Sequence, residues 1–167
     1  MLCQPLITRN DIAKYRQISK SANDAKLNEM ILDAQLLDLQ PLIGESLYNK
    51  LLASPSDFEE LLNGGIYEVD SISYTNYGLK MVLAYFTYAR IIMFSSVTDT
   101  QYSVVEKLND NSRPADASSK KTIYGLNRDA AFQIWENVKK YLSRTHSTDF
   151  NHCQHISANG LRFKKIV

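Results

Sequence analysis

The chain has 167 residues, with 19 Lys and Arg against 18 Asp and Glu, which gives a formal net charge of +1. A chain of this length forms about one domain around a single hydrophobic core. The balanced charge gives it no general attraction to nucleic acid, acidic substrates or anionic lipid. Two cysteines without a repeated spacing argue against a disulfide framework or a zinc knuckle. The first residues have no basic segment followed by a long apolar one, so we expect no secretory signal.

Two helices are predicted in the first third of the chain. Helical spacing of apolar residues begins after Asn23, which is a suitable cap, and the first helix is expected to end before Pro41. Pro41 suits the start of a second helix, which Pro55 stops. The residues that this spacing places on the buried faces are Leu27, Met30, Ile31, Ala34, Leu37, Leu42, Leu47, Leu51 and Leu52.

A short helix and a β-hairpin are predicted next. Ser56 would cap the helix, Glu59 stands at the capping-box position, and Gly64-Gly65 would end it. Residues 66–75 then alternate apolar and polar side chains around a polar Asp70-Ser71 centre. This pattern predicts two short strands and a tight turn, although the turn lacks the expected glycine.

The stretch KMVLAYFTYARIIMFSSVT predicts a central helix. From Met81 to Thr98 only Arg90 is charged, close to the lower length limit of about 18 residues for a bilayer span. A charge at the middle of the span is costly in lipid, so we interpret the segment as a helix buried on most sides. Arg90 is expected to pair with a carboxylate such as Asp99, or to reach the surface along its aliphatic stem. The predicted inner face consists of Leu79, Val82, Leu83, Phe86, Ala89, Ile92 and Met93.

A polar arm and a last helix follow. Residues 99–118 are rich in Asp, Asn and Ser, which is typical of an exposed arm. The last helix covers roughly residues 119–144, with Phe132 and Trp135 on its second face. Trp135 is either ordinary core or an interface anchor, because Trp is enriched where binding energy concentrates. The first face is predicted to carry Ile123, Leu126, Ala130, Ile134, Val138 and Tyr141.

The predicted fold is mainly α. We expect a small helical bundle of three long and two short helices with an inserted β-hairpin over residues 1–145, and an irregular C-terminal tail over residues 146–167. The tail is locally basic through Arg162, Lys164 and Lys165.

No catalytic motif is recognisable, so we expect no enzyme. Residues 11–28 have the rhythm of a helix-turn-helix, but Gln17 stands where the turn prefers glycine, and Asn23 and Lys26 would be polar in the small core of the motif. A DNA-binding regulator that uses this degenerate motif is the alternative function. A second alternative is a small hydrolase with a metal held by the tail residues His146, His152, Cys153 and His155.

Several phrases of the sequence resemble small virion proteins of tailed bacteriophages, especially of crAss-like and related gut phages. They are LITRNDIAKY, MILDAQLLDLQPLIGESLYNKLL, LLNGGIYE, YTNYGLKMVLAYFTYARIIMFSSV and AAFQIWENVKKYL. The order of segments is similar to that of the head–tail connector (adaptor) family over about residues 6–145.

The resemblance implies a mainly helical subunit of a homo-oligomeric ring of about twelve copies at the neck of the virion. Such a ring joins the portal to other neck or tail proteins and lines the DNA channel, without catalysis or cofactor. The resemblance also implies a place in the virion, reached from the host cytoplasm during assembly, with possible non-specific contact to packaged DNA and no membrane partner. The expected interface residues are Trp135, Phe132, Tyr85, Tyr88, Arg90, Tyr67, Tyr74, Arg162, Lys164 and Lys165.

Overall fold

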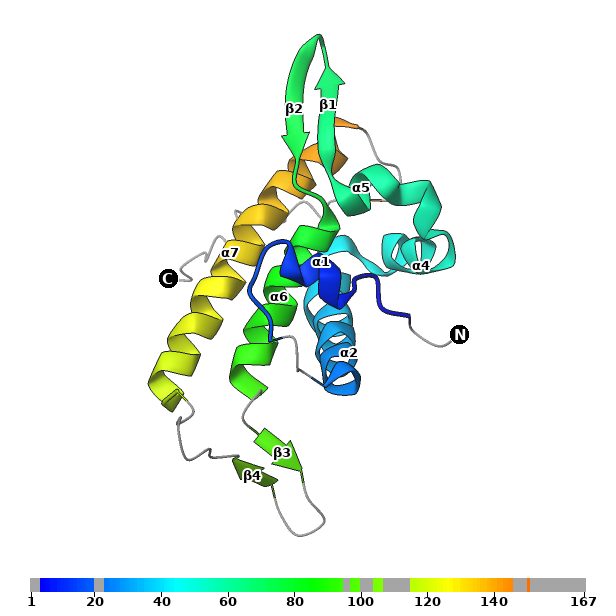
Figure 1. Cartoon of the computed structure of the whole chain (residues 1–167). Coiled ribbons are helices and arrows are strands. Elements are labelled where there is room, and N and C mark those ends of the chain that lie inside the picture. Colours follow the sequence, from blue (N-terminus) through cyan, green and yellow to red (C-terminus); the bar gives the residue numbers. More distant parts are fainter. Residues whose placement is uncertain are drawn as a thin grey trace, which may run out of the picture.

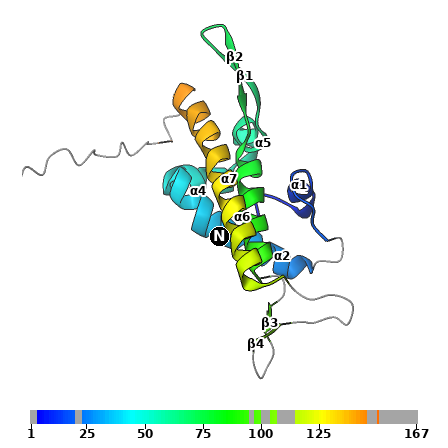
Figure 2. The same ribbon diagram turned by 90° about the vertical axis from the view of Figure 1, so that its left-hand side faces the viewer.

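A computed structural model describes most of the chain and confirms the predicted class, a mainly helical domain with an inserted hairpin. Two long helices, α6 and α7, run side by side, and α2 packs against α6 (Figure 1). A hairpin of β1 and β2 projects from one end of the helices, as a second view also shows (Figure 2). The described residues are 4–19, 23–94, 97–99, 104–106, 115–145 and 150.

The helix α2 begins where the sequence predicts. The Asn23 side chain accepts hydrogen bonds from the backbone N–H groups of Ala25 and Lys26, which confirms it as the cap. Before it, the short helix α1 is capped by Thr8 and is linked to α2 by an ion pair between Arg9 and Asp24. The bounds are α1 (Arg9–Ala13) and α2 (Asp24–Ala34).

The helix α2 ends at Ala34, before Pro41 as predicted, but the chain does not leave the helical conformation there. The chain continues through a π-helical turn, Gln35–Leu39, and then α3 (Gln40–Ile43). The Gln40 N–H donates to the Gln35 carbonyl, one residue further back than in an α-helix. This wider turn accommodates Pro41, whose ring would otherwise clash with the carbonyl four residues earlier.

The π-helical turn also changes which side chains face the core. A π-helical turn holds more residues than an α-helical one, which changes the direction of the side chains in it and after it. Leu37, predicted to be buried, is therefore 62% exposed. Gln35, Asp38 and Leu39 are buried in its place. Gln35 uses its amide fully, because it accepts from the Leu6 N–H at 2.9 Å and donates to the Gln4 carbonyl at 3.0 Å.

Two short helical segments lead to the hairpin. The predicted stop at Pro55 is confirmed, and Leu47 and Leu51 are buried as predicted, while Leu42 and Leu52 are half-buried. Ser56 does not act as the predicted cap, because the segment starts as a 3-10 turn without a side-chain cap. The bounds are α4 (Glu45–Ala53), the 3-10 turn Pro55–Phe58 and α5 (Glu59–Asn63).

The hairpin pairs β1 (Gly65–Val69) with β2 (Ile72–Asn76) in antiparallel register. Asp70 and Ser71 both have positive φ, 51° and 63°, so the tight turn forms at the predicted place without glycine. Both residue types tolerate this conformation better than branched side chains do.

The root of the hairpin depends on two glycines. Gly64 and Gly78 lie so close together that a Cβ on Gly78 would stand 2.6 Å from the Gly64 nitrogen. Their φ values of 76° and 79° also disfavour any other residue. The buried Asn76 joins the two segments, donating to the Glu60 carbonyl at 2.8 Å and accepting from the Gly78 N–H at 3.0 Å.

The central helix α6 (Leu79–Phe94) supplies most of the core. The predicted inner positions through Ala89 are buried, and Ala84 and Thr87 are buried as well, so the helix is covered on more than one side. Ile92 and Met93, predicted to be inner residues, are only half-buried because they lie in the last turn.

The last helix α7 (Ala117–Arg144) buries part of the predicted face, since Ile134 and Val138 are buried and Ala130 and Tyr141 half-buried. Leu126 and Ile123 are exposed, while Asn127 is buried. The amide of Asn127 is satisfied there, because it accepts from Arg16 Nε at 2.9 Å and donates to the Ile123 carbonyl at 2.7 Å. The buried residues of α7 are Asn127, Ala131, Ile134, Trp135, Val138 and Leu142.

The predicted arm over residues 99–118 lies only partly within the described residues. Two three-residue strands, β3 (Val97–Asp99) and β4 (Val104–Glu106), pair antiparallel there, which the sequence analysis did not predict. Figures 1 and 2 show this ribbon at the opposite end of the helices from the β1–β2 hairpin.

Within the described ranges, no helix has both the length and the apolar character needed to cross a bilayer.

Candidate functional site

The base of the β1–β2 hairpin is held by aromatic side chains and one arginine. The ring centroids of Tyr67 and Tyr141 are 4.8 Å apart in an edge-to-face contact, and those of Tyr67 and Tyr74 are 5.6 Å apart. The Arg144 guanidinium lies 3.8 Å from the centroid of the Tyr74 ring and donates to the Tyr67 hydroxyl at 3.0 Å. Tyr67 and Tyr74, predicted to be interface residues, are therefore half-buried supports of the hairpin on its inner face.

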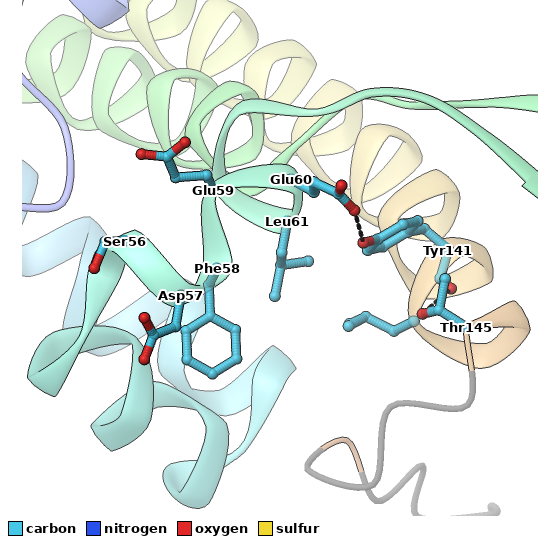
Figure 3. A pocket seen from close by; sticks show the side chains of 9 residues that line it. Ser56, Asp57, Phe58, Glu59, Glu60, Leu61, Tyr141 and Thr145 are labelled. Atoms are coloured by element: carbon cyan, nitrogen blue, oxygen red, sulfur yellow. Dashed lines mark hydrogen bonds between the residues drawn. The ribbon is translucent and has the colours of Figure 1, made fainter.

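Tyr141 also connects α7 to α5. Its hydroxyl donates to Glu60 Oε2 at 3.3 Å, as the dashed line in Figure 3 shows. Burial, with the negative charge of Glu60 as the next cause, raises the pKa of Tyr141. The phenol therefore stays neutral and keeps its proton for the hydrogen bond.

The opposite face of the hairpin is open to solvent. Cross-strand partners share a face, so Ile66 and Thr75 lie together on the side away from Tyr67 and Tyr74. Ile66 is 79% exposed on this face. Ile72, beside the turn, is exposed too, but it pairs with Val69 and therefore lies on the face of Tyr67 and Tyr74. The hairpin thus presents apolar side chains on a projecting element that is fixed at its base, and we call the face with Ile66 the hairpin surface.

A second apolar surface lies on the first half of α7. Leu126 is 64% exposed and lines a shallow cleft of about 370 Å³ together with Tyr88 and Tyr15. Arg16 forms the wall of this cleft, with its guanidinium 4.1 Å from the centroid of the Tyr85 ring. Tyr85 and Tyr88, predicted to be interface residues, are half-buried here. We call the area around Leu126 and this cleft the helix surface.

Arg90 is engaged inside the subunit. Its Nε lies 2.9 Å from Asp38 Oδ2, and Arg128 Nη1 lies 2.5 Å from Asp38 Oδ1. The Asp38 side chain is 3% exposed, so this carboxylate joins α6 and α7 to the π-helical turn from within. The predicted partner of Arg90 was Asp99, whose side chain lies outside the described structure. The observed pairing makes Arg90 a fold residue rather than an interface residue.

Arg128 is enclosed by this carboxylate and by rings. Burial acts to lower its pKa, but the hydrogen bond and charge of Asp38 outweigh that effect, so the pKa of Arg128 is raised. Its guanidinium also lies 5.4 Å from the Phe86 ring centroid and 5.7 Å from that of Phe132. Phe132 packs edge-to-face on Phe86 at 5.2 Å, and the rest of its ring remains exposed, as a predicted interface residue requires.

Of the two roles predicted for Trp135, ordinary core or interface anchor, the structure shows the core role. Trp135 is 4% exposed, and it packs in the core of the subunit and against Phe150, with the two ring centroids 5.8 Å apart. The reason is the rotation of α7, whose buried face runs through Trp135 and Val138 instead of Leu126.

A further cleft of about 390 Å³ lies between α5 and the end of α7 (Figure 3). Apolar side chains form its floor, and exposed carboxylates stand at its rim. The residues that line it are Ser56, Asp57, Phe58, Glu59, Glu60, Leu61, Tyr141, Leu142 and Thr145.

The two alternative functions depend on other segments. The described structure separates α1 from α2 by residues 14–23, whereas a helix-turn-helix joins its helices by a turn of about three or four residues. Arg162, Lys164, Lys165 and the candidate ligands His146, His152, Cys153 and His155 lie outside the described residues. Within the described part of the chain, no three His, Cys, Asp or Glu side chains come together as a metal site would require.

Sequence reasoning missed the residues that organise these surfaces. Asp38 follows two leucines in the sequence without a distinguishing signal, and it is the π-helical turn that places it inside. Arg16, Arg128 and Arg144 are ordinary helix or loop cations in the sequence. Their role comes from rings that lie far away along the chain.

Comparison with known proteins gives a family without an assigned function. No curated protein and no solved structure matches the chain significantly. A family model, described as a family of unknown function (DUF6712), matches residues 39–160, which is well over half of the chain and includes Ile66 and Leu126. The chain therefore belongs to the DUF6712 family of unknown function.

Proposed function

We propose that this protein is a structural subunit of a homo-oligomeric ring in the neck of a tailed bacteriophage virion. There it would join the portal to other neck or tail proteins and close the DNA path laterally, without catalysis. The observation that carries the proposal is the presence of two unlike apolar surfaces on one subunit, the hairpin surface and the helix surface. The resemblance of the sequence to head–tail connectors supports the same proposal.

The two surfaces have the properties that a ring contact needs. The hairpin surface projects, whereas the helix surface borders a shallow cleft. When a projecting patch of one copy fits a hollow patch of the next, the contact is head-to-tail, and its repetition closes a ring if the rotation allows. A dimer with a two-fold axis would need only one patch that contacts itself.

The surfaces are also far enough apart to contact different neighbours. Leu126 and Arg144, which supports the hairpin base, are both on α7, so about 27 Å of helix separates them. A specific interface buries on the order of 800 Å² per partner. A subunit of this size offers two such areas only by using much of its flank. The placement of Leu126 on the first half of α7 and of Ile66 on the hairpin beyond its other end is consistent with this.

Other segments would contact the portal and the tail. The hairpin stands clear of the helices in Figure 2, and we propose that its tip, the arm over residues 99–118 and the tail over residues 146–167 dock to the rings above and below. The basic residues of the tail could also contact packaged DNA without sequence preference. Before assembly the subunit would be in the host cytoplasm.

The proposal is tested by breaking each surface separately. We expect the wild-type chain, alone or with portal protein, to form a closed ring whose mass native mass spectrometry measures. Ile66→Asp and Leu126→Asp should each block ring formation, because each puts a charge into one half of the contact. Leu37→Asp is the matched control, since Leu37 is 62% exposed but lies on neither surface, and this variant should form rings as the wild type does.

Mixing the two blocked variants distinguishes the kind of contact. One Ile66→Asp subunit keeps an intact helix surface, and one Leu126→Asp subunit keeps an intact hairpin surface. An equimolar mixture should therefore give a dimer of the two variants that cannot grow further. Assembly of both variants at the wild-type level, or a wild-type chain that stays monomeric even with portal protein, would contradict the proposal.

A further inference from the structure

The cleft between α5 and the end of α7 has an apolar floor and an acidic rim. Leu61 and Leu142 are buried at its floor beside the half-buried ring of Phe58, and Leu61 points between the two walls in Figure 3. The exposed carboxylates of Asp57 and Glu59 stand at the rim. In the described part of the chain neither of them forms an ion pair, so the cleft combines apolar surface with unneutralised negative charge.

The chain itself leads from this cleft to a segment of matching chemistry. Thr145, the C-cap of α7, lines the cleft. Phe150 then contacts Trp135, which is seven residues before Leu142 and therefore on the same face of α7, about 10 Å away along the axis. Phe150, five residues after Thr145, therefore lies beside the stripe of α7 that forms part of the cleft floor.

The last residues of the sequence, LRFKKIV at 161–167, alternate apolar and basic side chains. Arg162, Lys164 and Lys165 supply three positive charges, and Leu161 and Phe163 supply apolar surface. From Phe150 to Leu161 an extended chain can span up to about 36 Å, several times the distance between Trp135 and Leu142. The segment can therefore reach the cleft of its own chain.

We propose that residues 161–167 bind in this cleft of the same chain, with Leu161 and Phe163 on the apolar floor and the three cations at the acidic rim. The attraction is local, because the whole chain carries a net charge of only +1. The inference does not depend on the ring, since neither Ile66 nor Leu126 takes part in it.

Disulfide trapping in the full-length chain tests the proposal. In a Cys3→Ser, Cys153→Ser background, Ser56→Cys is combined with Ile166→Cys, which leaves all charges of the tail in place. The matched control combines Ile166→Cys with Glu29→Cys, an exposed position on α2 outside the cleft. Because a docked segment has a high local concentration, we expect the first pair to form its disulfide at least about tenfold faster than the control.

Charge exchange then tests the recognition itself. Asp57→Lys with Glu59→Lys should slow trapping to the control rate, and so should about 1 M salt, which screens exposed charges. Adding Arg162→Glu, Lys164→Glu and Lys165→Glu to the reversed rim should restore the fast rate, which an unfolded variant could not do. The inference is overturned by equal rates for the two cysteine pairs, by rates that ignore the charge changes, or by disulfides that mass spectrometry finds only between two chains.

Discussion

The helical body buries charged side chains, whereas the hairpin exposes apolar ones. In the body, Asp38 lies inside between Arg90 and Arg128, so charged groups are buried together. In the hairpin, Ile66 and Ile72 lie outside, with more than half of each side chain exposed. Buried charges are tolerated only with partners, and exposed apolar side chains on a projecting element are typical of a contact with another molecule. The comparison separates side chains that fix the fold from those available for binding.

One helix serves both regions. The first half of α7 supplies Arg128 to the buried cluster, and its last turns supply Tyr141 and Arg144 to the hairpin base. Changes at the two ends of α7 should therefore have effects of different kinds. A change in the buried cluster should lower global stability, whereas a change at the hairpin base should act locally.

The largest effect is expected at the buried carboxylate. Asp38→Ala leaves Arg90 and Arg128 without their partner, and we expect it to lower the free energy of unfolding by about 3–5 kcal/mol. Urea denaturation followed by circular dichroism measures the change. Glu29→Ala, an exposed substitution on α2, is the control and should change the free energy by less than about 0.5 kcal/mol. A similar small loss for Asp38→Ala would show that the cluster is not important for the fold.

A smaller effect is expected at the root of the hairpin. Gly78→Ala forces a Cβ against the backbone of Leu62, Asn63 and Gly64, and should cost about 2–3 kcal/mol. The matched control is Gly125→Ala in α7, where a Cβ meets nothing within 4 Å. This control should stabilise the protein by about 0.5–1 kcal/mol, because alanine is the better helix former. Thermal unfolding measures both, and a loss of stability in the control would refute the steric explanation.

The smallest effect is expected at the hairpin base and depends on pH. Burial and then Glu60 raise the pKa of Tyr141, so the folded state holds this proton more tightly than the unfolded state does. The contribution is fully present below the unfolded pKa of about 10, and is lost as the pH rises through the folded pKa. The difference in unfolding free energy between wild type and Tyr141→Phe should therefore be constant from about pH 7 to 9 and shift in favour of the variant above about pH 10. A difference that does not change with pH would mean that Tyr141 ionises equally in both states.

Local signals in the sequence predicted much of the fold. The Asn23 cap and the Asp70-Ser71 turn are where the residue types indicate, because both depend on backbone preferences within a few residues. Leu37 was misplaced because a π-helical turn shifts the helical period by one residue, and no residue pattern announced that shift. Local rules could place the long helices and the β1–β2 hairpin, but not the β3–β4 ribbon or the rotation of one element against another.

The candidate surfaces were harder to predict for the same reason. Leu126 is exposed instead of buried, and Trp135 is core, the first of its two possible roles. The rotation of α7 that produces this involves the contact of Asn127 with Arg16, which is 111 positions away in the chain. Arg90 pairs with Asp38, 52 positions away on the π-helical turn, rather than with a carboxylate just after its own helix. Single-sequence reasoning identified the hairpin as an exposed element but could not show which of its faces is free.

The contact between Gly64 and Gly78 fixes the direction of the hairpin through the backbone, in addition to the side-chain contacts of Tyr67 and Tyr74. Asn76 and Asn137 fix the same place from both sides, since Asn137 accepts from the Tyr77 N–H and donates to the Thr75 carbonyl, each at 3.0 Å. The turn between Val69 and Ile72 could then be exchanged for a foreign peptide, while Tyr67, Tyr74 and the contacts below them stay unchanged. In that sense the domain is a ready scaffold for displaying a short loop at a fixed angle, whatever its natural partner recognises there.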